Sequence, residues 1–194
     1  MSRTAEYVKT ISGLINYEEA DWDVLAAERE TIKTWAPELI AAFYDTLYSL
    51  DDTRKVFHEG ERPKLEATLE KWIVSILSGR QNDEFWDHQW YVALLHIQRG
   101  TKNLFMLGIM NRLQQVFLEK SIQNFTPQRA LEVFEAFLRI SGMVAGLIAQ
   151  CYDEVTETST RDGLTRVGLN EALIKRIKDM QITKMLEEVK GSAG

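Results

Sequence analysis

The sequence is poor in the residues that build disulfide, zinc or hydrolase centres. Cys151 is the only cysteine in the 194 residues, which excludes an intrachain disulfide and a thiolate metal cluster. No His-Glu-x-x-His or Cys-x-x-Cys spacing occurs, so catalytic zinc is a poor candidate. Neither a Gly-rich phosphate loop after a strand nor a nucleophile elbow is present. The sequence therefore offers no motif for a disulfide, a zinc centre or a hydrolase nucleophile.

Positive charge and long hydrophobic runs are also scarce. The 23 basic and 29 acidic residues give a formal net charge of -6, which argues against nucleic acid and anionic membrane as main partners. The most apolar long segment, 134–152, is interrupted by Glu135 and Arg139 and is not expected to span a bilayer. The first residues, Met-Ser-Arg-Thr-Ala-Glu, lack the apolar stretch of a signal peptide. We therefore expect a cytoplasmic protein.

Helical periodicity fills almost the whole chain, and no segment alternates like a half-buried strand. Apolar residues make up 45% of the sequence, which is a globular composition. The only three prolines, Pro37, Pro63 and Pro127, each stand where a helix is expected to begin. The pattern predicts an all-α protein with helices at about 4–15, 19–33, 37–49, 63–78, 84–98, 102–123, 127–158 and 168–189.

His96 differs from the other two histidines because its neighbours are apolar. It ends the segment Tyr-Val-Ala-Leu-Leu-His, whereas His58 and His88 lie in polar surroundings. Such a histidine is most often a core residue with one hydrogen bond satisfied. The alternative is an axial ligand to iron, for which a neutral imidazole on a buried helix is suited. The local pattern leaves both interpretations open.

Tyr44 lies on the apolar face of the helix expected at 37–49, together with Ile40, Phe43 and Leu47. A tyrosine in this position usually packs in the core with its hydroxyl bonded to a carbonyl. Its functional alternative is a single hydroxyl donor directed into a cavity, where a partly negative oxygen ligand would accept the hydrogen bond.

Small residues share one face of the helix expected at 127–158, namely Gly142, Ala145, Gly146 and Ala149. Such a face allows another backbone to approach closely, within the same helical bundle or across a dimer interface. The sequence pattern alone favours neither alternative.

Taken in order, several segments resemble the globin-coupled sensor family, haem globins that bind gases and usually drive a signalling output. The resemblance covers about residues 20–155. The spacing from Leu65 through Ser78-Gly79 to His96 and Gly100 looks like that of the bacterial aerotaxis transducers in this family. It is carried by Phe43-Tyr44-Asp45, Leu65-Glu66-Ala67-Thr68-Leu69-Glu70-Lys71-Trp72-Ile73, Leu77-Ser78-Gly79, Asp83-Glu84-Phe85 and His96-Ile97-Gln98-Arg99-Gly100.

The resemblance implies a globin fold with an extra N-terminal helix, packed around a pocket for haem b (iron protoporphyrin IX). It implies His96 as the proximal ligand of the haem iron and Tyr44 as the hydrogen-bond donor to bound O2, with CO and NO as further gas ligands. Leu65 and Thr68 would line the distal side, with Thr68 as a second donor. Phe105 stands where many members have a tryptophan near the haem edge. Phe43 and Leu69 complete the expected haem-binding set.

The resemblance further implies a homodimer formed by the last two globin helices, and a signalling output domain or partner. We expect a sensor globin domain at 1–155 and a linker with a C-terminal helix at 156–194. Residues 156–165 read as a polar linker with turn residues. The segment from Asp162 to Leu173 faintly resembles the opening of a diguanylate cyclase of the GGDEF type.

The sequence is also compatible with two other functions. One is a haem enzyme acting as a nitric-oxide dioxygenase or in peroxidase-like chemistry, although the expectation is a sensor without catalytic activity. The other is a haem-free globin fold that serves only protein interaction, which the presence of both His96 and Tyr44 argues against.

Overall fold

The structure is a computed structural model that describes residues 3–192. Its elements are α1 (Arg3–Ile15), α2 (Ala20–Ala27), α3 (Arg29–Lys33), α4 (Ala36–Ser49), α5 (Asp51–Arg54), α6 (Arg62–Ile76), α7 (Asp83–Gln98), α8 (Asn103–Asn124), α9 (Pro127–Arg166) and α10 (Glu171–Ser192). No strand occurs in this range, which confirms the all-α prediction. Within the same residues, no helix is both long and apolar enough to cross a membrane.

The observed helices follow the predicted ones closely, with one division, one addition and one extension. The segment expected at 19–33 is divided at Glu28 into α2 and α3. The short helix α5 was not predicted from the sequence. Pro37 and Pro63 lie in the first turns of α4 and α6, and Pro127 begins α9, as the proline positions predict.

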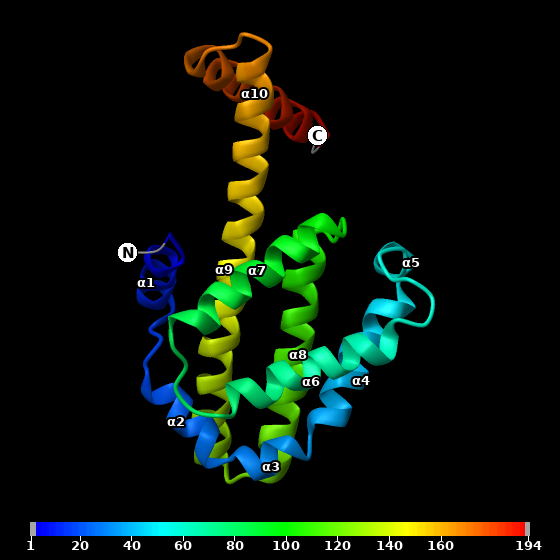
Figure 1. The fold of residues 1–194 in the computed structure, drawn as a ribbon, viewed down its shortest axis with the longest axis vertical. Coiled ribbons are helices and arrows are strands. Elements are labelled where there is room, and N and C mark those ends of the chain that lie inside the picture. The colour runs from blue at the N-terminus through cyan, green and yellow to red at the C-terminus, as the bar shows by residue number, and fades with distance from the viewer. Residues whose placement is uncertain (1–2, 193–194) are drawn as a thin grey trace. The chain divides into compact units, whose positions relative to one another are not determined.

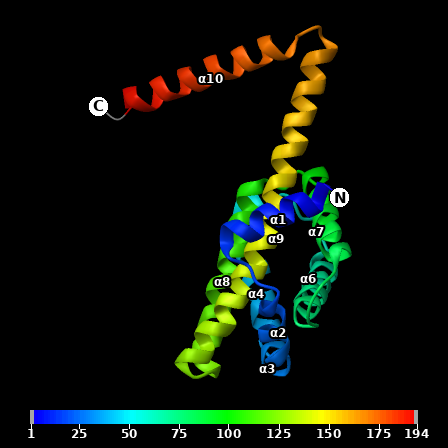
Figure 2. The same ribbon diagram turned by 90° about the vertical axis from the view of Figure 1, so that its left-hand side faces the viewer.

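The chain divides into two compact units, Met1–Tyr152 and Asp153–Gly194, and α9 contributes residues to both. In the first unit, α6 and α7 lie on one side of the long helices α8 and α9 (Figures 1 and 2). The core between α8 and α9 includes a stacked pair of rings, Phe117 and Phe137, with centroids 3.8 Å apart. Trp35, which precedes α4, packs edge-on against Phe117 at 5.4 Å.

The N-terminal helix α1 covers part of the small-residue face of α9. A Cβ atom added at Gly146 would lie 3.2 Å from Cγ2 of Ile11, and one at Gly142 would lie 3.6 Å from Cδ1 of Ile15. Any residue larger than glycine at position 146 would therefore crowd Ile11 of α1. These two glycines serve packing within the chain, so the dimer alternative gains no support from them.

In the second unit, the expected linker at 156–165 is helical instead. The helix α9 continues through these residues to Arg166, so the turn residues Asp162 and Gly163 make no turn. The chain turns later, at Gly168, which has a φ of 88° and donates its N–H to the Thr165 carbonyl. Glycine tolerates this left-handed conformation without strain. Asn170 directly precedes α10, and its side-chain oxygen accepts the N–H of Leu173 at 3.0 Å.

Candidate functional site

A cavity of about 580 Å³ lies in the first unit, lined mainly by α4, α6, α7 and α8. This volume is within the roughly 300–1,000 Å³ that is usual for small-molecule and cofactor sites. All the site residues expected from the sequence line this one cavity: Phe43, Tyr44, Leu65, Thr68, Leu69, His96 and Phe105. The fold therefore brings together residues that are far apart in the sequence.

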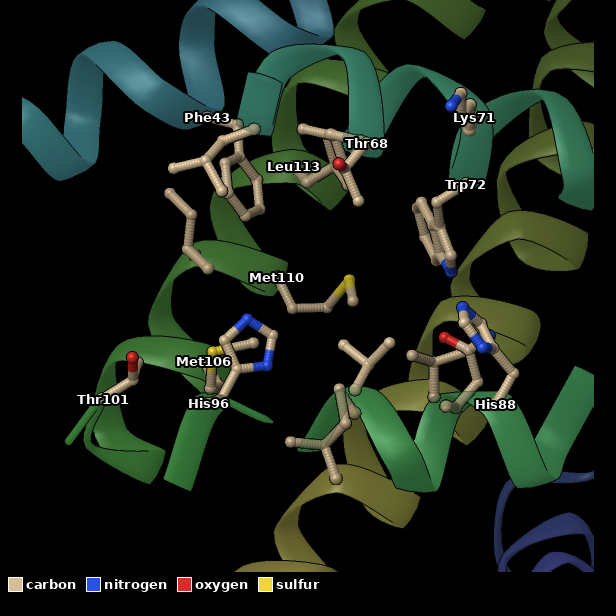
Figure 3. A pocket seen from close by; sticks show the side chains of 18 of the residues that line it. Phe43, Thr68, Lys71, Trp72, His88, His96, Thr101, Met106, Met110 and Leu113 are labelled. Atoms are coloured by element: carbon tan, nitrogen blue, oxygen red, sulfur yellow. The ribbon is translucent and has the colours of Figure 1, made fainter. Parts of the chain in front are cut away.

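His96, in the last turn of α7, projects its imidazole into the cavity (Figure 3). Its Nδ1 atom is buried and has no well-formed hydrogen bond to any described residue. Burial lowers the pKa of His96 and the nearby Arg99 guanidinium lowers it further, while the Val92 carbonyl one turn earlier opposes this shift. The imidazole is therefore held neutral, the form that binds a metal.

Tyr44 reaches the cavity from α4 and is buried, with 7% of its surface exposed. Its ring lies 5.0 Å from that of Phe43 and 6.4 Å from that of Phe57, so its position is fixed by aromatic packing. Burial raises the pKa of Tyr44, with a smaller contribution from Glu66 in the same direction. The phenol stays protonated, and none of the described residues accepts its hydrogen bond. It is a donor available to a ligand.

Side chains of α6 form the wall that faces His96. Leu65 and Leu69 are half-buried and pack against the cluster that contains Tyr44. Thr68 also lines the cavity, but its hydroxyl donates a 3.0 Å hydrogen bond to the Lys64 carbonyl one turn earlier. In this structure the threonine donor is therefore occupied within its own helix.

Several lining residues were not predicted from the sequence. Met106 and Met110 line the cavity from α8, with Met110 between the two walls, and Trp72 lies beyond Thr68 on α6 (Figure 3). Trp72 belongs to the segment that carries the family resemblance, but the sequence did not single it out as a site residue. His88 had been assigned to a polar patch, yet it lines the cavity together with Lys71. No sequence signal separates such residues from ordinary core or surface positions, because the packing of α6 on α7 decides which side chains line the cavity.

Ionic and hydrogen-bonded contacts close the cavity near the C-terminal end of α7. Arg99 pairs with Glu61, which precedes α6, and Glu61 also accepts the His58 backbone N–H at 2.7 Å. The Thr101 carbonyl accepts the Tyr152 hydroxyl at 2.7 Å. The Arg99 guanidinium and the Thr101 carbonyl are thus engaged with other parts of the protein.

The residues present fit a haem group. A porphyrin is flat and apolar over most of its surface, and the cavity offers an aliphatic and aromatic wall from α6 facing the imidazole wall from α7 (Figure 3). The lowered pKa of His96, and the Val92 carbonyl one turn earlier that faces its imidazole, match the requirement for an axial ligand. Buried and half-buried thioethers and aliphatic side chains would keep water from the metal.

A family model described as Protoglobin matches residues 4–158. The chain belongs to the Protoglobin family. Among solved structures, this protoglobin is similar to the globin domain of a globin-coupled sensor from Geobacter sulfurreducens, with a TM-score of 0.68 and 21% identity over 74% of this chain and 96% of that one.

The protoglobin is also similar to the globin domain of DosC from E. coli in its ferric form, with a TM-score of 0.61 and 15% identity. That match covers 75% of this chain and 99% of the other. A comparison with curated proteins found no match. The family and the structural neighbours confirm the globin fold and the resemblance to globin-coupled sensors that the motifs predict.

Proposed function

We propose that this protoglobin binds haem b through His96 and senses a diatomic gas, with O2 as the principal ligand and CO and NO as others. When bound, haem supplies an iron centre that binds such gases. The observation that carries the proposal is that a neutral imidazole with a buried Nδ1 atom, that of His96, and the Tyr44 phenol, which has no hydrogen-bond partner among the described residues, line the same apolar cavity.

The division of roles follows from the chemistry of the two side chains. His96 holds the metal from the α7 side, because a neutral imidazole nitrogen is a good iron ligand. Tyr44 donates a hydrogen bond to the gas from the α4 side, and the Phe43 and Phe57 rings keep the phenol in place. A hydrogen bond of this kind favours O2 over CO, because O2 accepts more negative charge when it binds.

We further propose that residues 1–155 act as the sensor domain and that residues 156–194 transmit its state to a signalling output domain or partner, with a homodimer as the working unit. Two features support this. The helix α9 carries residues of the globin unit and continues into the second unit. Large apolar side chains of α10 are exposed, among them Ile177, Met180 and Leu186. Binding of the gas to haem would then shift the protein's population between two arrangements of its helices.

Visible spectra of the purified protein, recorded without ligand, with O2 and with CO, test this function. We expect a strong Soret band that shifts when either gas is added. The proposal would be wrong if the protein remained without a Soret band in the presence of excess haem, since the haem-free alternative would then apply.

A further inference from the structure

We propose that the cofactor turns its two carboxylates to the mouth of the cavity between α6 and α7, where Lys71 and His88 bind them. The inference rests on the proposed function, because it names the residues that hold the polar edge of the same group. It depends on three observations: where the cavity is open, which donors there are free, and which donors elsewhere are engaged.

Apart from Thr68, the exposed members of the cavity lining gather on one side. Lys71 lies on α6, Asn82 in the turn between α6 and α7, and Glu84 and His88 in the first two turns of α7, and all four are exposed. Figure 3 shows Lys71, Trp72 and His88 at one end of the pocket, away from Phe43 and His96. Carboxylates placed here would keep their contact with water and avoid the cost of burial.

Lys71 and His88 are free to bind an anion. Among the described residues, no carboxylate lies within ion-pair distance of the Lys71 ammonium, and no group is hydrogen-bonded to the His88 ring, which lies 6.1 Å from that of Tyr91. Gln81, nearby, already donates its amide to the carbonyls of Ser75 and Gly79. The mouth therefore presents one free ammonium and one free imidazole.

Among the described residues, the opposite end of the cavity offers no unpaired cationic side chain. The Arg99 guanidinium is paired with Glu61, and the Thr53 hydroxyl donates to the carbonyls of Leu47 and Leu50. A carboxylate at this end would have to displace Glu61 from a half-buried arginine. The geometry thus favours one orientation of an amphiphilic planar group over its reverse.

One charge at the mouth opposes the binding of carboxylates. Glu84 lines the same end and accepts a 3.4 Å hydrogen bond from the Asn82 amide. Its negative charge repels the carboxylates of the cofactor, so its removal should act in the opposite sense to the removal of Lys71. This opposite sign separates an electrostatic role from a general loss of folding.

The test compares haem with haem dimethyl ester, in which both carboxylates are esterified and therefore uncharged. The rate of transfer from the full-length loaded protein to excess apomyoglobin is measured for wild type, Lys71→Met, His88→Gln and Glu84→Gln. Lys64→Met is the matched control, because Lys64 is an exposed lysine on the same helix that does not line the cavity.

We expect Lys71→Met to speed haem loss about two- to fivefold, as an exposed ion pair predicts. His88→Gln should act in the same direction, and Glu84→Gln should slow the loss. The ester should leave all variants at one common rate, and Lys64→Met should match wild type. The inference is overturned if Lys71→Met loses haem at the wild-type rate, or if its faster loss persists with the ester. A wild-type protein that takes up neither porphyrin would contradict the proposed function instead.

Discussion

The Tyr152 hydroxyl donates a 2.7 Å hydrogen bond to the Thr101 backbone carbonyl, while the Thr101 N–H donates to the His96 carbonyl at 3.0 Å. Tyr152 lies on α9 and is the last residue of the globin unit. Two consecutive hydrogen bonds therefore join the helix that carries His96 to the helix that leaves the unit. Burial raises the pKa of Tyr152 to about 12, so the phenol is protonated and can donate near neutral pH.

Replacement of Tyr152 by Phe should loosen the turn that follows His96. The lost hydrogen bond should lower the free energy of unfolding by about 0.5–1.5 kcal/mol and speed haem loss. Urea unfolding and haem transfer to apomyoglobin measure the two effects. Tyr91→Phe is the control, because Tyr91 is 54% exposed and should behave as wild type. Equal haem loss in Tyr152→Phe and wild type would show that this hydrogen bond does not support His96.

Replacement of Tyr44 by Phe should release O2 faster. A hydrogen bond to a charged acceptor contributes roughly 1.5–3 kcal/mol, so the dissociation rate constant should rise about tenfold or more. The affinity for CO should change much less, because CO accepts a hydrogen bond poorly. Stopped-flow displacement of O2 by CO measures the rate, and Tyr48→Phe is a control on the same helix that does not line the cavity. Unchanged O2 release would remove Tyr44 from this role.

The haem-free protein should lose stability in mild acid partly through His96. Its pKa is lowered in the folded state, so below the ordinary value near 6.5 the unfolded chain binds more protons than the folded one. Stability then falls with falling pH until the lowered pKa is reached, by at most about 1.4 kcal/mol per pH unit. Urea unfolding at pH 7.0 and 5.5 should show a larger loss for wild type than for His96→Gln. Equal losses would contradict the buried, neutral state of this imidazole.

Helix positions could be predicted well because apolar periodicity and three prolines mark them. The exceptions have local causes. The four-residue α5, Asp51–Arg54, is too short for any periodicity to register. The stretch 156–165 contains turn residues, but extending an existing helix costs little per residue, and one glycine at 163 costs only about 1 kcal/mol. The turn instead occurs at Gly168.

The candidate site could be predicted only where a residue stood out from its surroundings. His96 is a polar group within an apolar helix, and Tyr44 belongs to a recognisable motif, so both were singled out. Trp72, Met110 and His88 carry no such contrast, since an apolar residue on a helix stripe or a histidine near an aspartate is ordinary. Their place in the cavity depends on how α6, α7 and α8 pack, which is not encoded locally.

The central claim is that the His96 imidazole holds the haem, and haem titration of His96→Gly tests it most directly. Wild type should bind added haem with a strong Soret band and a five-coordinate ferrous spectrum. His96→Gly should lose that spectrum and regain it when free imidazole fills the space left by the side chain. The account would be contradicted if His96→Gly kept the unaltered five-coordinate spectrum without imidazole.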